Sequence, residues 1–253
     1  MNDNTEVRFA RLERAPAYKI VSDAILKDII AGRLRMGSQL PSEQKLAEQF
    51  GVNRSTVREG IRLLEESGVL QREFGKRLIV SRPSYDSVGG RISRAMILHE
   101  VTFRELWEAI MAIEPATAAL AARKRNSDDL DRIENNIART RASLSEGQAL
   151  VALDIEFHSL IAQAAANRAI VLAREALSQL FYPAFKAVLV DGGGSAAGAR
   201  LVAAHEAIAQ AIAESDTETT WKWMERHIAD FRKGYELLGF DIDLPIEAPG
   251  IRD

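Results

Sequence analysis

Residues 51–64, GVNRSTVREGIRLL, contain the pattern that decides the fold of the N-terminal part of the chain. Gly51 ends one predicted helix, and Asn53 is a suitable N-cap for the next, which we expect to run to about Ser67. Apolar residues at spacings of four and three predict its buried face, which consists of Val57, Ile61 and Leu64. Polar side chains fill the first turn, so this helix presents hydrogen-bonding groups at its exposed N-terminal end.

Two more helices and a hairpin surround this stretch. Residues 18–32 carry apolar side chains at spacings of three and four, and Ser42 is a suitable cap for a helix over 42–50. Short apolar runs at 69–70 and 78–80 flank a basic turn and predict a β-hairpin. Helix, turn, helix and basic hairpin together are typical of a winged helix-turn-helix, which is a DNA-binding arrangement.

The start of the third helix is the predicted DNA-reading surface. Arginine can bind guanine O6 and N7 in a bidentate manner, so Arg54 and Arg58 are the predicted base readers. The remaining polar groups, which we expect to contact phosphates, are Asn53, Ser55 and Thr56. Gly75 and Lys76 mark the hairpin tip, which can approach the DNA backbone or minor groove. The alternative is that all of these are solvated surface residues of a small helical domain.

Charge divides the chain into two parts. Residues 16–82 carry twelve Lys and Arg against eight Asp and Glu, whereas residues 83–253 carry eighteen against twenty-five. Cysteine is absent and no window is apolar enough for a membrane helix, so we expect a cytoplasmic protein without disulfides or thiolate sites and with no membrane partner. The predicted divisions are an N-terminal tail at 1–15, the winged helix-turn-helix at 16–82, a linker at 83–90, an all-α domain at 91–240 and a C-terminal tail at 241–253.

Every informative segment after residue 90 has helical periodicity, so the chain is predicted to be mainly α, with an all-α bundle of six or seven helices in its second part. The predicted helices cover residues 91–99, 102–124, 128–146, 149–166, 168–190, 196–214 and 217–239.

Three of the four histidines occupy positions at which this periodicity expects apolar residues. Asp154 and His158 lie one turn apart beside a buried face, and His205 and His227 lie within the apolar stripes of two later helices. An isolated buried histidine is usually a core residue with a satisfied hydrogen bond. Three of them with a carboxylate favour a shared divalent cation instead. Such a set with an open position suits Zn²⁺ and also admits Ni²⁺ or another first-row metal.

Motifs in both parts resemble a known family. Residues 37–43, GSQLPSE, followed by residues 51–59, GVNRSTVRE, resemble the DNA-binding domain of GntR transcriptional regulators. Residues 154–158, DIEFH, with the two later histidines resemble the FCD effector domain of the FadR subfamily. This resemblance implies that the Asp and three His bind a metal at the floor of a cavity for a small organic acid. It also implies that Asn167 lies near that cavity, although Asn167 is equally suited to cap the next helix.

The chain departs from the family pattern at three positions. Gln44 and Ile110 stand where many members carry Arg, which removes a DNA contact at the first and a carboxylate partner at the second. Gly60 replaces the usual Ala, which lowers the helix propensity of the third helix by about 1 kcal/mol. Other cations that could contact an acid are Arg104, Arg174, Lys186 and Arg200.

We therefore expect a metal-containing transcriptional repressor whose operator affinity is controlled by a small organic acid. One recognition helix reads few base pairs, so we expect a homodimer on a near-palindromic double-stranded DNA operator. No phosphate-binding loop is evident, and neither Glu156 nor Glu206 is placed to act as a general base beside the histidines, so we expect no enzyme. Two alternatives stay open, a metalloenzyme fused to a DNA-targeting module and a metal-ion sensor.

Overall fold

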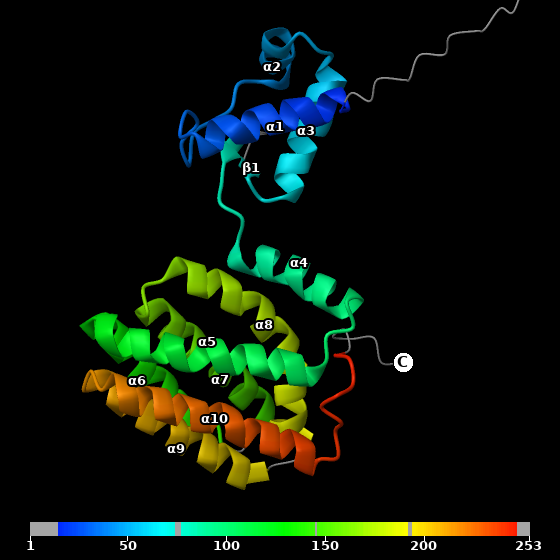
Figure 1. The fold of residues 1–253 in the computed structure, drawn as a ribbon. Helices are drawn as coiled ribbons and strands as arrows, with labels where there is room; N and C mark the ends of the chain where they lie inside the picture. The colour runs from blue at the N-terminus through cyan, green and yellow to red at the C-terminus, as the bar shows by residue number, and fades with distance from the viewer. Residues whose placement is uncertain (1–14, 74–76, 145, 192–193, 247–253) are drawn as a thin grey trace, which may run out of the picture. The chain divides into compact units, whose positions relative to one another are not determined.

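The computed structural model describes residues 15–73, 77–144, 146–191 and 194–246 (Figure 1). The chain divides into two compact units, Met1–Ser84 and Tyr85–Asp253. Among the described residues, no helix combines the length and the apolar composition that crossing a bilayer requires.

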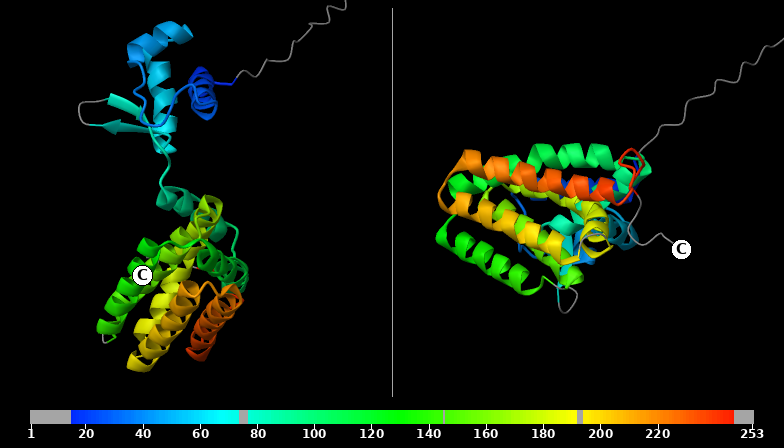
Figure 2. Two further views of the ribbon diagram at one scale, coloured as in Figure 1. Left: turned by 90° about the vertical axis from the view of Figure 1, so that its left-hand side faces the viewer. Right: turned by 90° about the horizontal axis from the view of Figure 1, so that it is seen from below.

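The first unit is a winged helix-turn-helix, as predicted (Figure 2). Its elements are α1 (Ala17–Ile30), α2 (Glu43–Phe50), α3 (Arg54–Glu66), β1 (Leu70–Glu73) and β2 (Arg77–Val80). The two strands pair antiparallel, with Leu70 opposite Val80. Gly75 and Lys76, the predicted wing tip, lie outside the described residues.

Local sequence signals fix the two ends of α2. The Ser42 side chain accepts a hydrogen bond from the backbone N–H of Lys45, which caps α2. Gly51 adopts a left-handed conformation with φ of 66° and ends that helix. The predicted stripe of α3 is buried, and it forms the core of this unit with residues of α1, α2 and the hairpin, among them Val21, Ile25, Leu46, Leu70 and Val80.

Gly60 gives α3 its close approach to α1. A Cβ atom at this position would lie 2.7 Å from the backbone oxygen of Tyr18, 3.1 Å from Val21 Cγ1 and 3.3 Å from the backbone nitrogen of Ser22. Hence the low helix propensity of Gly60 accompanies a packing requirement that the sequence pattern does not reveal.

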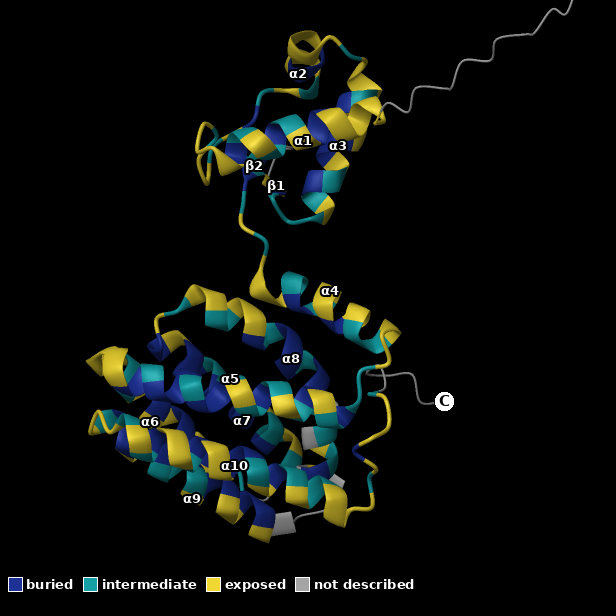
Figure 3. Ribbon diagram, viewed as in Figure 1, coloured by how far each residue is buried: buried dark blue, intermediate teal, exposed yellow. Residues whose placement is uncertain are grey.

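The second unit is a helical bundle, as predicted. Its helices are α4 (Tyr85–Leu98), α5 (Phe103–Lys124), α6 (Ser127–Ala142), α7 (Gly147–Ala164), α8 (Arg168–Lys186), α9 (Gly194–Ala213) and α10 (Thr217–Leu237), and a π-helical turn, η1 (Ala187–Asp191), follows α8. Helix α5 packs against α7, α8, α9 and α10, and α6 covers α7 and α9. The buried faces of these helices point into the bundle (Figure 3).

The prediction that residues 83–90 form a linker is wrong for most of that segment, because α4 begins at Tyr85. Gly89 lets α4 lie close to α8, since a Cβ atom there would be 2.9 Å from Gln179 Nε2. Ser93 Oγ also donates to the backbone oxygen of Ala176 at 2.9 Å. The glycines that suggested a linker are therefore part of a helix–helix contact.

Part of the predicted C-terminal tail belongs to the bundle. Ile242 is buried, and its backbone oxygen accepts from the N–H of Arg104 at 2.8 Å. The backbone oxygen of Leu244 accepts from the N–H of Phe103 at 3.2 Å. These N–H groups belong to the first turn of α5 and have no partner within the helix, so the returning chain satisfies them.

Candidate metal centre and DNA-binding surface

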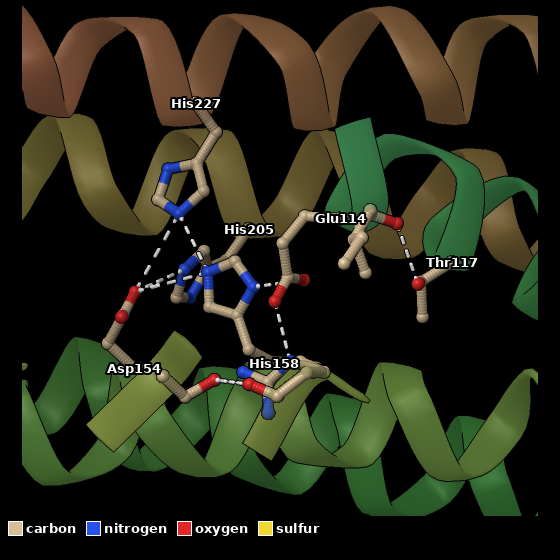
Figure 4. Close-up of polar contacts among 9 residues, drawn as sticks. Glu114, Thr117, Asp154, His158, His205 and His227 are labelled. Atoms are coloured by element: carbon tan, nitrogen blue, oxygen red, sulfur yellow. Dashed lines mark hydrogen bonds and ion pairs between the residues drawn. The ribbon is translucent and has the colours of Figure 1, made fainter. Parts of the chain in front are cut away.

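Four buried side chains from three helices converge inside the second unit (Figure 4). Asp154 and His158 come from α7, His205 from α9 and His227 from α10. Each offers one ligand atom, and the four atoms all lie within 4.8 Å of one another. The structure thus brings together all four residues that the sequence singled out as metal ligands.

The distances between these ligand atoms are close to the ligand–ligand distances of a metal site. His205 Nε2 lies 3.1 Å from Asp154 Oδ1, and the Nε2 atoms of His158 and His227 are 3.2 Å apart. Asp154 Oδ1 lies 3.8 Å from His158 Nε2 and 3.7 Å from His227 Nε2. A tetrahedral zinc site with bonds of about 2.0–2.1 Å separates its ligand atoms by roughly 3.4 Å. The four residues therefore fit a metal ion.

Glu114 of α5 fixes the orientation of His158. Glu114 Oε2 lies 3.0 Å from His158 Nδ1, so an Nδ1–H that donates to it leaves the lone pair on Nε2, facing the other ligands. Arg174 of α8 donates from Nε to Glu114 Oε1 at 2.5 Å. Burial raises the pKa of Glu114, but Arg174 and His158 outweigh burial and lower it to about 2. Glu114 is thus ionised at neutral pH.

The charges in this cluster favour a cation. Burial raises the pKa of Asp154, but the neighbouring histidines outweigh burial and hold it well below its usual range. Burial lowers the pKa of His158, and Glu114 and Asp154 more than compensate and raise it. Burial lowers the pKa of His205 to about 4, so its imidazole is neutral at pH 7. The Asp154 carboxylate and imidazole nitrogens are donors of the kind that divalent cations bind, and a cation at His158 would displace the proton that Glu114 and Asp154 favour there.

Packing positions His205. Its ring lies flat on the Phe157 ring, with centroids 3.6 Å apart and an angle of 8° between the planes. Its Nδ1 is buried and has no hydrogen-bond partner among the described residues, and the same holds for Asn136 Oδ1 on α6. Stacking on Phe157 therefore sets the ring plane, and Asp154 is the hydrogen-bonding group that its Nε2 faces.

A cavity of about 30 Å³ borders the cluster. This volume holds one or two water-sized groups, so an organic acid requires the surrounding side chains to move. Its apolar walls come from Ile110, Phe181, Ile228 and Phe231, and its polar wall comes from Arg174, Ser178 and Tyr182. Ile110 thus lines the cavity, in keeping with the resemblance, which implied an acid-binding role for that position.

Several predicted effector contacts lie elsewhere. Asn167 does not line this cavity, and its Oδ1 accepts from two backbone N–H groups at the start of α8, at 3.1 and 3.3 Å, so it caps that helix. Arg104 pairs with Asp243 and Arg200 pairs with Asp230, in both cases at the surface. Lys186 is exposed, so Arg174 is the one of the four candidate cations that lines the cavity.

The predicted DNA-reading helix presents its polar side chains to solvent. The exposed residues are Asn53, Arg54, Ser55 and Arg58, and Thr56 is half-buried. Asn53 stands at the N-cap of α3 without a side-chain cap hydrogen bond, which leaves its amide available to a partner. Gln44 on α2 is exposed and donates to Glu48 at 3.1 Å.

Glu43 of α2 orients both predicted base readers, a role that sequence reasoning missed. Its Oε2 accepts from Arg54 Nε at 3.1 Å and from Arg58 Nη2 at 3.3 Å. Arg72 of β1 lies 3.7 Å from the same carboxylate. Burial raises the pKa of Glu43, but the hydrogen bonds from Arg54 and Arg58 outweigh it and lower the pKa. The ionised carboxylate therefore holds the two guanidinium groups on one face of α3.

Both regions match known protein families. Residues 17–80 match the bacterial regulatory proteins of the gntR family, and residues 105–230 match the FCD domain. RmpR of Mycobacterium gastri is 30% identical over 227 residues, which cover 86% of this chain and 78% of RmpR. The chain belongs to the GntR family and carries an FCD domain. The fold is shared with Streptococcus agalactiae GntR, which aligns with a TM-score of 0.65 and 25% identity over 85% of this chain and 99% of that chain.

Two further relatives are regulators. LutR of Bacillus subtilis, an HTH-type transcriptional regulator, is 30% identical over 136 residues, 54% of this chain and 62% of LutR. NanR of Cronobacter sakazakii, an HTH-type transcriptional repressor, is 28% identical over 159 residues, 62% of this chain and 61% of NanR. The match therefore spans less than two thirds of either protein. These relatives are transcriptional regulators and not enzymes, in agreement with the prediction.

Proposed function

We propose that this protein is a transcriptional repressor that binds operator DNA as a homodimer and is controlled by a small organic acid at a metal centre. The observation that carries the proposal is the convergence of four buried metal-ligand side chains in an FCD domain. The same chain contains a recognition helix with exposed arginines, and the named relative NanR is a repressor. A regulator that binds operator DNA acts in the cytoplasm, which is the location we propose.

In the DNA-binding unit, Arg54 and Arg58 read guanines in the major groove while Asn53 and neighbouring hydroxyls contact phosphates. The N-terminal end of α3 adds backbone donors and a positive dipole end for phosphate. The wing tip, with Gly75 and Lys76, contacts the adjacent backbone or minor groove. Two copies of the unit on a near-palindromic site double these contacts and supply the specificity that one helix lacks.

In the FCD domain, Asp154, His158, His205 and His227 hold the cation, for which Zn²⁺ is the first candidate and Ni²⁺ the second. With these four residues as ligands, the cation would bind a carboxylate oxygen of the effector by expanding its coordination beyond four. The charges of Glu114 and Arg174 cancel, so a divalent cation with Asp154 leaves a local charge of about +1, which favours an anion in the water-poor cavity. Coupling between effector and operator is expected to change DNA affinity about 5–150-fold.

The test uses the full-length protein in three forms: zinc-loaded, chelator-treated and zinc-reconstituted. An operator is selected from a pool of random duplexes, and its affinity is measured by fluorescence anisotropy with and without a panel of hydroxy, keto, dicarboxylic and aromatic acids. We expect one zinc per chain and an acid that changes operator affinity in the two zinc-containing forms alone. His99→Ala is the matched control, because His99 is exposed and lies outside the cluster.

Three results would contradict the proposal in different ways. Failure to select a duplex removes the DNA-binding function. Operator binding that responds to zinc alone supports a metal sensor. Chemical turnover of an acid, measured by product analysis after prolonged incubation, supports the metalloenzyme alternative.

A further inference from the structure

Arg174 is a buried cation whose hydrogen-bonding capacity is mostly unused. Its exposed fraction is 5%, and its guanidinium group has five N–H donors. One of these, on Nε, donates to Glu114 Oε1. Neither Nη atom donates to another described residue. Because Arg174 lines a cavity and a guanidinium group can bind a carboxylate through paired N–H donors, these Nη donors are suited to receive an anionic ligand.

Helix α8 presents a polar stripe to the cavity beside the metal ligands. Arg174, Ser178 and Tyr182 are spaced four residues apart, which places them on one face of the helix. All three line the same cavity as Asp154, His158 and His227. Burial raises the pKa of Tyr182, so its hydroxyl stays protonated at neutral pH and can donate a hydrogen bond. The side chains opposite this stripe include Ile110 and Ile228, which offer no hydrogen bond.

We propose that Arg174 binds the carboxylate of the effector and that Tyr182 binds an adjacent hydroxyl, so that a short hydroxy acid is the preferred ligand. This inference rests on the proposed function and assigns the chemical class of its effector. The small cavity favours a short chain, because every added carbon requires further displacement of its apolar walls. Arg174 is the one Lys or Arg that lines the cavity within the described part of the chain.

The contact with Glu114 prepares Arg174 for this role. Glu114 holds the Nε edge of the guanidinium group at 2.5 Å, which restricts the rotation of the group while the Nη atoms make no hydrogen bond to Glu114. A donor that is already oriented loses less entropy on binding than a mobile surface side chain does. The same Glu114 orients His158, so the carboxylate-binding group and the metal ligands share one support.

The test is isothermal titration calorimetry on zinc-loaded full-length protein with three probes. Acetate and glycolate differ by one hydroxyl group, and imidazole is a neutral metal ligand that needs no cation. The variants are Arg174→Gln, Arg174→Lys and Tyr182→Phe, and the matched control is Arg139→Gln, since Arg139 pairs with Glu156 at the surface. Zinc content is measured by elemental analysis for every protein.

We expect Arg174→Gln to keep its zinc and its imidazole affinity and to lose at least tenfold in affinity for acetate and glycolate. Arg174→Lys retains a charge without the planar fork, so its loss should be smaller. Tyr182→Phe should weaken glycolate binding severalfold and leave acetate unchanged. Arg139→Gln should match the wild type with all three probes.

Unchanged acid affinity in both Arg174 variants would overturn the inference, as would equal losses for the acids and imidazole, which indicate a purely structural role. A zinc-loaded wild type that binds imidazole but neither acid overturns the inference while the metal centre stands. A wild type that holds no zinc or other metal overturns the proposed function as well, and elemental analysis separates the two cases. If Arg174→Gln does not fold, Arg174→Lys decides.

Discussion

Substituting Gly60 by Ala tests the close contact between the recognition helix and α1. Helix propensity alone predicts that Gly60→Ala stabilises α3 by about 1 kcal/mol. The structure opposes that gain, because the new methyl group would lie 2.7 Å from the backbone oxygen of Tyr18. A backbone atom cannot rotate away as a flexible side chain does, so α1 and α3 must separate by several tenths of an ångström. Overpacking of this kind costs about 1–3 kcal/mol, which gives a net destabilisation of roughly 1 kcal/mol.

Gly90→Ala is the matched control. Gly90 lies within α4, and a Cβ atom there would meet Gln179 Oε1 at 3.5 Å, which is an ordinary contact. The control should therefore be neutral or more stable by up to about 1 kcal/mol. Both substitutions replace a helical glycine by alanine, and they differ in which atoms the new methyl group contacts.

The two units can be followed separately during urea unfolding. The three tryptophans, Trp107, Trp221 and Trp223, all belong to the second unit, so their fluorescence reports that unit, whereas far-UV circular dichroism reports both. Gly60→Ala should lower the urea midpoint of the transition of the first unit, which circular dichroism detects and fluorescence does not. Gly90→Ala should affect the transition of the second unit, which fluorescence follows. An unchanged or raised stability of the first unit in Gly60→Ala would refute the packing argument. A weaker operator affinity should accompany the shift, since α3 carries the base-reading arginines.

Three further predictions concern the binding surfaces. Arg58→Ala should leave the circular dichroism spectrum unchanged and cost about 1–3 kcal/mol of specific operator binding in anisotropy titrations; unchanged discrimination between operator and scrambled duplex would contradict its assignment. His205→Ala should abolish the stabilisation of the fold by zinc, which is about 2.7 kcal/mol when the zinc concentration is a hundred times the dissociation constant and is seen as a rise in melting temperature. Retained zinc in this variant would exclude His205 as a ligand. Because the folded-state pKa of Glu114 is lowered to about 2, its contribution of about 3 kcal/mol is complete above the unfolded value of 4.5 and is lost as pH falls toward 2. Denaturation curves of metal-free protein should show this acid limb, and Glu114→Gln should reduce it while the part due to Asp154 remains.

Periodicity and capping were sufficient to predict the helix-turn-helix. Its buried stripe, the Ser42 cap and the break at Gly51 depend on neighbours along the chain, and all three are present in the structure. The same reasoning failed at residues 85–90, because a glycine that permits contact with α8 has the same appearance in sequence as a glycine in a flexible linker. The role of Ile242 was missed for a similar reason, since its partners lie at the start of α5.

The metal-ligand set was predictable because polar residues interrupted apolar stripes on individual helices. Asp154 and His158 share one helix, so their proximity follows from helical spacing alone. Glu114 left a weaker signal of the same kind, because it continues the buried spacing of Leu106 and Ile110 on α5. The contact between Glu43 and the two base-reading arginines joins two helices and left no such signal.

Position 110 shows why a buried site is defined by where side chains converge rather than by which helix supplies them. Sequence reasoning sought the acid-binding cation there and found Ile110, which suggested that the metal must carry more of the carboxylate recognition and left four other cations as possible second contacts. The structure places Arg174, from a different helix, on the same cavity as Ile110. Arg174 needs an ionised partner to remain buried, and Glu114 provides it. The cavity thus retains a cation although its α5 wall is apolar, so stripping the metal should weaken acid binding without removing every charged contact. Residual acetate binding in chelator-treated wild type, absent in chelator-treated Arg174→Gln, would be the direct sign of that second contact.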